Sequence, residues 1–168
     1  MRKDNLGDRM KSYENINRTY LPGRMPIIIR LDGCHFHTFT KGFKKPYDEV
    51  FHNAMNETMK YLCENIQGCK LGYTQSDEIT LLLTDYDTLT IDAWFGYNVQ
   101  KMCSVAASMA TLAFNRVFST RVHLWAKEHG IAPIAYLNEG KDEQLLKLYD
   151  TYINALTNGA MFDARCFN

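Results

Sequence analysis

The fold of this chain is decided by two stretches, Pro26-Ile27-Ile28-Ile29-Arg30-Leu31-Asp32-Gly33 and Gln75-Ser76-Asp77-Glu78-Ile79-Thr80-Leu81-Leu82-Leu83. Each stretch joins an apolar, strand-like run to a carboxylate. If the two strands pair antiparallel, the end of the first lies beside the start of the second, so Asp32 and Asp77 meet at one edge. Two close carboxylates repel each other unless a cation lies between them. Hard oxygen ligands suit Mg²⁺, above all where substrate phosphates complete its octahedron. The pattern therefore predicts a phosphoryl-transfer site with two Mg²⁺ ions.

Each motif also has a plainer structural interpretation. An Asp followed by Gly after a strand is often only a turn, and Ser76-Asp77-Glu78 before a strand can be a solvated loop. A short motif carries little weight alone, whereas the two motifs together favour a site. Arg30 interrupts the apolar strand just before Asp32. We expect a buried charge there, which needs a carboxylate or a phosphate as its partner.

Hydrophobic periodicity and turn signals predict a single α+β domain. We expect strands at about residues 25–31, 69–74 and 78–84, with a last strand starting near residue 161. Helical patterns cover about 50–62, about 92–125 and 142–156, with a further helix possible in 8–18, inside an N-terminal extension of residues 1–24. The alanine-rich and methionine-rich stripe of the longest helix is typical of a core. The order strand, helix, strand, strand, helix, strand is that of the ferredoxin-like split βαβ domain, which is also the palm of many polymerases and nucleotidyl cyclases.

Composition limits the kind of protein. The chain has 168 residues, 46% of them hydrophobic, which suits one domain with a sizeable core. Net charge is zero, but residues 1–45 carry ten Lys or Arg against four Asp or Glu; an anionic substrate and a solvated basic face explain this excess equally well. Five cysteines without a CxxC pair argue against a disulfide framework and for a cytoplasmic protein with reduced thiols. No apolar run approaches the roughly 18 residues of a membrane span, so we expect no membrane partner.

Three motifs, in this order, resemble those of the tRNA-histidine guanylyltransferase family and its Thg1-like relatives. They are Ile29-Arg30-Leu31-Asp32-Gly33-Cys34-His35-Phe36-His37-Thr38-Phe39-Thr40, Phe43-Lys44-Lys45-Pro46-Tyr47-Asp48 and Tyr73-Thr74-Gln75-Ser76-Asp77-Glu78. The resemblance covers about residues 24–115. It implies Mg²⁺-dependent addition of a nucleotide, GTP preferred, to the 5′ end of tRNA in the 3′-5′ direction, as in tRNA-His guanylylation or 5′-end repair. ATP first activates the 5′-monophosphate, and the 3′-hydroxyl of the incoming nucleotide then attacks it. The resemblance also implies a homo-oligomer, either a dimer or a tetramer.

The motifs indicate which residues form the site. Asp32 and Asp77 are the expected metal ligands, and the family adds the carbonyl of Gly33. Glu78 is the third predicted catalytic residue. Because it is one residue beyond Asp77, it should face the other side of the strand and influence the site without binding the metal directly. We expect the N–H groups of residues 33–37 to cradle a triphosphate, with a hydroxyl from Ser76 opposite. The loop residues after Gly33 are Cys34, His35, Phe36 and His37.

Other roles are specific to side chains. Gly33 should let the backbone approach a phosphate, and Phe36 and Phe39 should anchor the loop in the core. The resemblance places His37 near the phosphates, Lys45 and Asp48 beside the nucleotide, and Lys101 against a triphosphate. Arg30 is an expected phosphate contact, and Lys44 an expected solvated neighbour.

The chain departs from the family pattern in three places. Tyr97-Asn98 stands where the family has basic residues, which bears on the activating nucleotide. Phe162-Asp163-Ala164-Arg165 has Ala for the usual Gly, and the family's later H-I-N-N-L-Y-N segment, in its RNA-handling portion, is not present. Two other interpretations stay open: a palm-domain nucleotide cyclase or conventional nucleotidyltransferase with the same metals, and a nucleotide-binding or RNA-binding module whose catalysis has lapsed.

Overall fold

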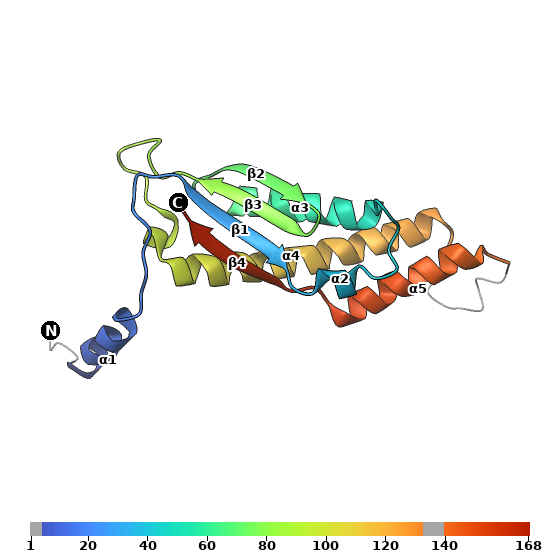
Figure 1. Ribbon diagram of the computed structural model, residues 1–168, viewed down its shortest axis with the longest axis horizontal. Coiled ribbons are helices and arrows are strands. Elements are labelled where there is room, and N and C mark those ends of the chain that lie inside the picture. Colours follow the sequence, from blue (N-terminus) through green and yellow to red (C-terminus); the bar gives the residue numbers. More distant parts are fainter. Residues whose placement is uncertain (1–4, 133–139) are drawn as a thin grey trace.

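A computed structural model describes residues 5–132 and 140–168. Its centre is a four-stranded antiparallel sheet in the order β2-β3-β1-β4 (Figure 1). The strands are β1 (Ile27–Gly33), β2 (Cys69–Gln75), β3 (Glu78–Leu83) and β4 (Phe162–Phe167). The antiparallel pairing of β1 with β3, on which the predicted meeting of carboxylates depends, is confirmed. Only Ser76 and Asp77 connect β2 to β3, so the predicted hairpin is also confirmed.

Five α-helices and one 3₁₀ turn complete the described chain. They are α1 (Asn5–Asn15), α2 (Phe36–Phe39), α3 (Glu49–Asn65), η1 (Trp94–Tyr97), α4 (Val99–Glu128) and α5 (Glu143–Asn158). The long helix begins at Val99, seven residues later than the predicted start near Asp92. Phe95, Gly96 and Tyr97 all have positive φ, which a right-handed helix does not accept. Asn98 then caps α4 by accepting a hydrogen bond from the Lys101 N–H.

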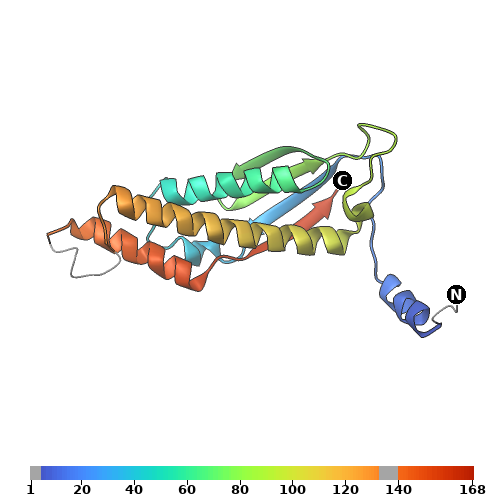
Figure 2. The same cartoon turned by 180° about the vertical axis from the view of Figure 1, so that it is seen from behind.

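Helices α3 and α4 cover one face of the sheet, and α5 runs along α4 (Figures 1 and 2). Alternate residues of the two central strands therefore face the helices, and these are fully buried: Ile27, Ile29, Leu31, Ile79, Leu81 and Leu83. No described helix lies over the other face. Arg30 points to that open face and is exposed, so the prediction of a buried charge is wrong. In a sheet covered by helices on one side only, every second residue of a strand faces solvent, and a polar residue such as Arg30 can lie there.

Aromatic rings fill the core between α2, α3 and α4. The buried Phe36 ring lies 5.1 Å from Phe39 and 5.6 Å from Phe114, measured between ring centroids, and the rings of Phe114 and Phe118 are stacked. The expectation that Phe36 and Phe39 anchor their loop in the core is confirmed. On α4, Met102 and the alanines beside it are buried, as predicted. These contacts pack the loop after β1 against the core at one end of the sheet.

Helix α1 stands apart from the rest, on an extended segment that leads to β1 (Figures 1 and 2). None of its residues is buried. Among the described residues, no helix combines the length and the apolar character that crossing a membrane requires.

Candidate functional site

Four carboxylates gather at the Gly33 end of β1, and we call them the carboxylate edge: Asp32, Asp77, Glu78 and Asp163. The register places Asp32 directly opposite Glu78 on β3 and opposite Asp163 on β4. Residues directly opposite in a sheet project from the same face, so Glu78 shares the open face with Asp32. The prediction that Glu78 faces away from the metal ligands is therefore wrong for Asp32. Asp77 belongs to the turn and not to the strand, so strand alternation does not relate it to Glu78.

Asp77 reaches the same end of the sheet through its turn. Its carbonyl accepts a hydrogen bond of 3.2 Å from the Gly33 N–H, and the Ser76 hydroxyl donates to its carboxylate at 2.9 Å. Ser76 has a φ of 55°, which allows the two-residue connection. The structure thus brings Asp32 and Asp77 to one edge, as the two motifs indicate.

Negative charge accumulates at this edge. Partial burial, followed by the charges of Asp77, Asp163 and Glu78, raises the pKa of Asp32, while Arg165 acts in the opposite direction. An Asp whose ionised form is disfavoured by three other acidic side chains is stabilised by a cation. The donor set of carboxylate and carbonyl oxygens fits Mg²⁺. No three His, Cys, Asp or Glu side chains form a metal cage by themselves in the described ranges, so water or a bound phosphate would have to supply further oxygens.

The loop after β1 offers fewer N–H groups than predicted. The Gly33 N–H is taken by Asp77, and the Cys34 N–H donates to the Met161 carbonyl at 2.8 Å. The N–H groups of residues 35–37 make no hydrogen bond to another described residue, so they are available to an anion. Gly33 has a packing role as well, because a Cβ there would lie 2.2 Å from the Phe36 ring. The glycine is needed for the core whether or not a phosphate approaches it.

A pocket of about 440 Å³ lies between α2 and α3, and we call it the α2–α3 pocket. It brings together predicted nucleotide-binding residues from all three motifs: Phe36, His37, Lys45, Asp48, Ser76 and Asp77. Lys44 and Thr40 line it too. Lys44 is exposed, as expected for a solvated residue, but its place in the wall was missed. Its position next to Lys45 in a basic, turn-forming segment was the available signal.

Asp48 is a buried wall residue of this pocket whose carboxylate is already engaged. One oxygen accepts the Phe51 N–H at 3.0 Å and so caps α3, and the other accepts the Lys44 N–H at 3.0 Å and the Tyr152 hydroxyl at 2.8 Å. Burial, and then the hydrogen bond to Asp48, raises the pKa of Tyr152. Asp48 therefore joins the pocket segment, α3 and α5.

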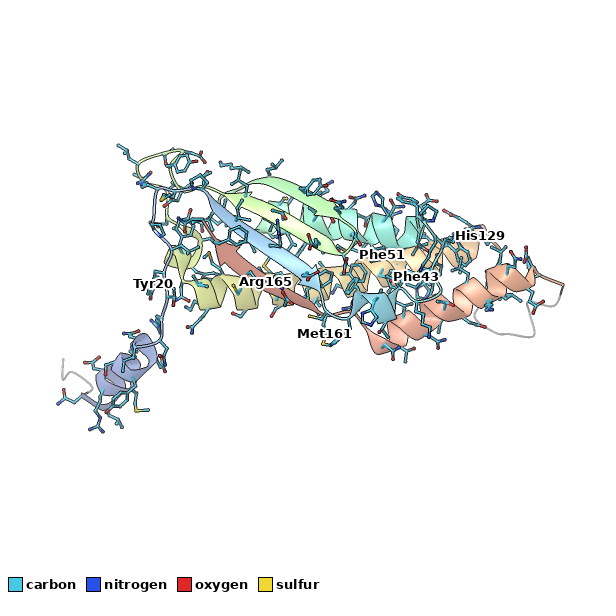
Figure 3. All side chains as sticks on the ribbon, in the orientation of Figure 1. Tyr20, Phe43, Phe51, His129, Met161 and Arg165 are labelled. Atoms are coloured by element: carbon cyan, nitrogen blue, oxygen red, sulfur yellow. The ribbon has the colours of Figure 1, made fainter. Side chains whose placement is uncertain are left out.

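Lys101 and Arg30 do not line the α2–α3 pocket. Lys101 is on the first turn of α4, where Val99 and Asn98 contact Thr19 and Tyr20, and α2 is at the other end of β1 (Figure 1). Arg30 lies on the open face opposite Arg165 of β4 (labelled in Figure 3). Like charges directly opposite each other on neighbouring strands repel, and a bound anion would reduce the repulsion between Arg30 and Arg165.

Cys34 and His35 do not line the α2–α3 pocket, and they are not part of the arginine pair. They face a separate cleft between α2 and α5. The short helix α2 thus divides the predicted loop residues between two cavities.

Comparison with known proteins agrees with these motifs. Residues 7–168 match the family model Thg1: tRNAHis guanylyltransferase. Two solved structures of bacterial tRNA(His) guanylyltransferase (Thg1)-like protein, one in complex with GTP and one with ATP, are each 44% identical to the chain, with TM-scores of 0.71 and 0.70. They match 98% and 96% of this chain and 63% and 57% of their own. The tRNA(His) guanylyltransferase of Eremothecium gossypii is 29% identical over 167 residues, 89% of this chain and 65% of that protein.

The chain therefore spans less than two thirds of the length of each of these relatives. The family match nevertheless extends over nearly all of it and includes the strands, the α2–α3 pocket and the carboxylate edge. On this evidence the chain belongs to the tRNA(His) guanylyltransferase (Thg1) family.

Proposed function

We propose that this chain adds a nucleotide, with GTP preferred, to the 5′ end of a tRNA in the 3′-5′ direction. One observation carries the proposal: residues of three separate motifs, His37, Lys45 and Ser76 among them, line one pocket beside the carboxylate edge. The complexes of similar proteins with GTP and with ATP support a nucleotide as the ligand.

In this reaction the α2–α3 pocket holds the incoming nucleoside triphosphate. His37, Lys44 and Lys45 supply donors and positive charge for the phosphates, and the buried carboxylate of Asp48 keeps the pocket segment in place. Its 440 Å³ is within the range of small-molecule sites. Positioning of this kind accounts for most of the catalysis in phosphoryl transfer, because the protein supplies no nucleophile.

Asp32 and Asp77, with the carbonyl of Gly33, are the groups that would hold two Mg²⁺ ions, which when bound lower the pKa of the attacking 3′-hydroxyl and offset charge on the departing group. Glu78 and Asp163 add negative charge on the same face. We also propose that Arg30, beside Arg165, contacts phosphates of the activated 5′ end across the open face.

We further propose that the domain is a ferredoxin-like palm. The strand order β2-β3-β1-β4 and the helical crossover through α3 support this interpretation. In such a sheet β1 and the β2–β3 hairpin bring their acidic ends together, which is the arrangement the proposed chemistry needs.

The test is incubation with a 5′-monophosphorylated tRNA, ATP and labelled GTP, with Mg²⁺ present. We expect label at the 5′ end of the RNA, whereas a soluble cyclic product would indicate a cyclase and binding without product a lapsed module. Asp32→Ala and Asp77→Ala should each reduce the rate more than about tenfold, or about 1.4 kcal/mol of barrier. Asp150→Ala, an exposed carboxylate on α5, is the matched control. Residual activity above a tenth in either site variant contradicts the assignment of metal ligands.

A further inference from the structure

The cleft between α2 and α5, which we call the α2–α5 cleft, has a volume of about 550 Å³ and shares no lining residue with the α2–α3 pocket. In Figure 1, α5 passes α2 on the side away from α3, and Met161 marks the edge of this region in Figure 3. Its polar wall consists of His35, Thr38, Lys41, Thr151, Asn154 and Asn158. The proposed function leaves this cleft without a role.

The chemistry of the wall suits a nucleotide. Thr151, Asn154 and Asn158 are three and four residues apart, so they line one face of α5. Within the described part of the chain, the Asn154 and Asn158 amides and the Lys41 ammonium have no hydrogen-bond or ion-pair partner, and no carboxylate lines the cleft. Amides donate and accept, as a base edge requires, and a lysine matches a phosphate. Phe39 and Ala155 supply an apolar surface beside these groups.

The cleft also reaches the reacting end of the sheet. Cys34 lines it, and the Cys34 sulfur lies 3.9 Å from a carboxylate oxygen of Asp163, which is opposite Asp32. The α2–α3 pocket reaches the same carboxylate edge through Asp77. Two cavities therefore flank one group of carboxylates, with α2 between them.

Joining one nucleotide to another requires two nucleotides beside the same phosphate. We infer that the α2–α5 cleft binds the 5′-terminal nucleotide of the RNA acceptor, while the α2–α3 pocket holds the incoming triphosphate. This inference rests on the proposed function, since it assigns the second substrate of the same reaction.

The experiment measures binding and extension of one probe, a 5′-monophosphorylated RNA hairpin. The variants are Lys41→Ala and the double variant Asn154→Ala/Asn158→Ala, and the control is Thr157→Ala, an exposed α5 residue outside the cleft. The double variant should raise the RNA dissociation constant about tenfold, as expected for loss of two net hydrogen bonds, and leave GTP affinity unchanged. Lys41→Ala should reduce the salt dependence of RNA binding by about one phosphate contact, which the double variant should not do.

The outcomes separate the two claims. If the wild type extends the RNA and the cleft variants bind RNA as tightly as the control, the cleft assignment is overturned and the proposed function stands. If the wild type binds RNA without extending it and the variants weaken binding, the function is wrong and the cleft assignment is supported. Absence of RNA binding by the wild type, or an equal loss of GTP and RNA affinity, also overturns the assignment. Lys41→Ala supplies an independent answer if the double variant fails to fold.

Discussion

Replacing Asp48 with Ala should destabilise the protein by about 3 kcal/mol, since the carboxylate satisfies three donors at once. Loss of the α3 cap costs about 1 kcal/mol. The Tyr152 hydroxyl is then left without an acceptor, which costs about 1–3 kcal/mol because its side chain is only 1% exposed. The Lys44 N–H adds little, because Lys44 is exposed and water can replace the lost acceptor.

Tyr152→Phe removes only one of these hydrogen bonds. It should cost about 1.5 kcal/mol, in the range for a hydrogen bond to a charged group. In the double variant the stranded hydroxyl is absent as well, so the two losses should not add, and the coupling free energy should be about 1–2 kcal/mol. Urea denaturation at pH 7 measures the free energy of unfolding of the wild type, both single variants and the double variant, and the coupling free energy follows from these four values.

A loss below about 1 kcal/mol in Asp48→Ala, or additive losses in the double variant, would refute the role assigned to these hydrogen bonds. GTP affinity gives a separate reading. Tyr152 does not line the α2–α3 pocket, so Tyr152→Phe should bind GTP as the wild type does. A large loss of GTP affinity in that variant would show that the pocket depends on α5 more than the geometry indicates.

Three further outcomes are expected. Because the pKa of Asp32 is raised in the folded state, the wild type loses stability as the pH rises above the ordinary value of 3.8. Asp32→Asn should therefore melt at a higher temperature than the wild type at pH 7 without divalent metal. This difference in melting temperature should vanish near pH 3, where Asp32 is protonated in both states. A lower melting temperature at pH 7 would contradict this account. Gly33→Val should lower the free energy of unfolding by about 1–3 kcal/mol in chemical denaturation, because the added side chain clashes with the Phe36 ring. An unchanged denaturation midpoint would show that the core rearranges to accommodate the valine. GTP with Mg²⁺ should raise the melting temperature, and Lys45→Ala should reduce that shift; an equal shift would place the phosphates elsewhere.

Much of the sheet follows from the sequence alone. The apolar runs from Ile27 to Leu31 and from Ile79 to Leu83 predict two strands, and the two residues Ser76 and Asp77 leave room only for a hairpin. Since a carboxylate closes the first strand and precedes the second, antiparallel pairing brings Asp32 and Asp77 to one edge without further information. These features depend on neighbours within a few residues or on a single strand pairing, which is why periodicity and spacing predict them.

The tertiary structure alone decided what surrounds that edge. Arg30 is exposed because α3 and α4 both pack on the other face of the sheet, which no local pattern in β1 records. Asp48 is held by Tyr152, which is 104 residues away along the chain. Residues 34–37 are divided between two cavities because α5 packs beside α2. A local pattern specifies the conformation of a segment, whereas exposure, hydrogen-bond partners and cavities depend on which distant segments pack against it, and those contacts exist only in the folded chain.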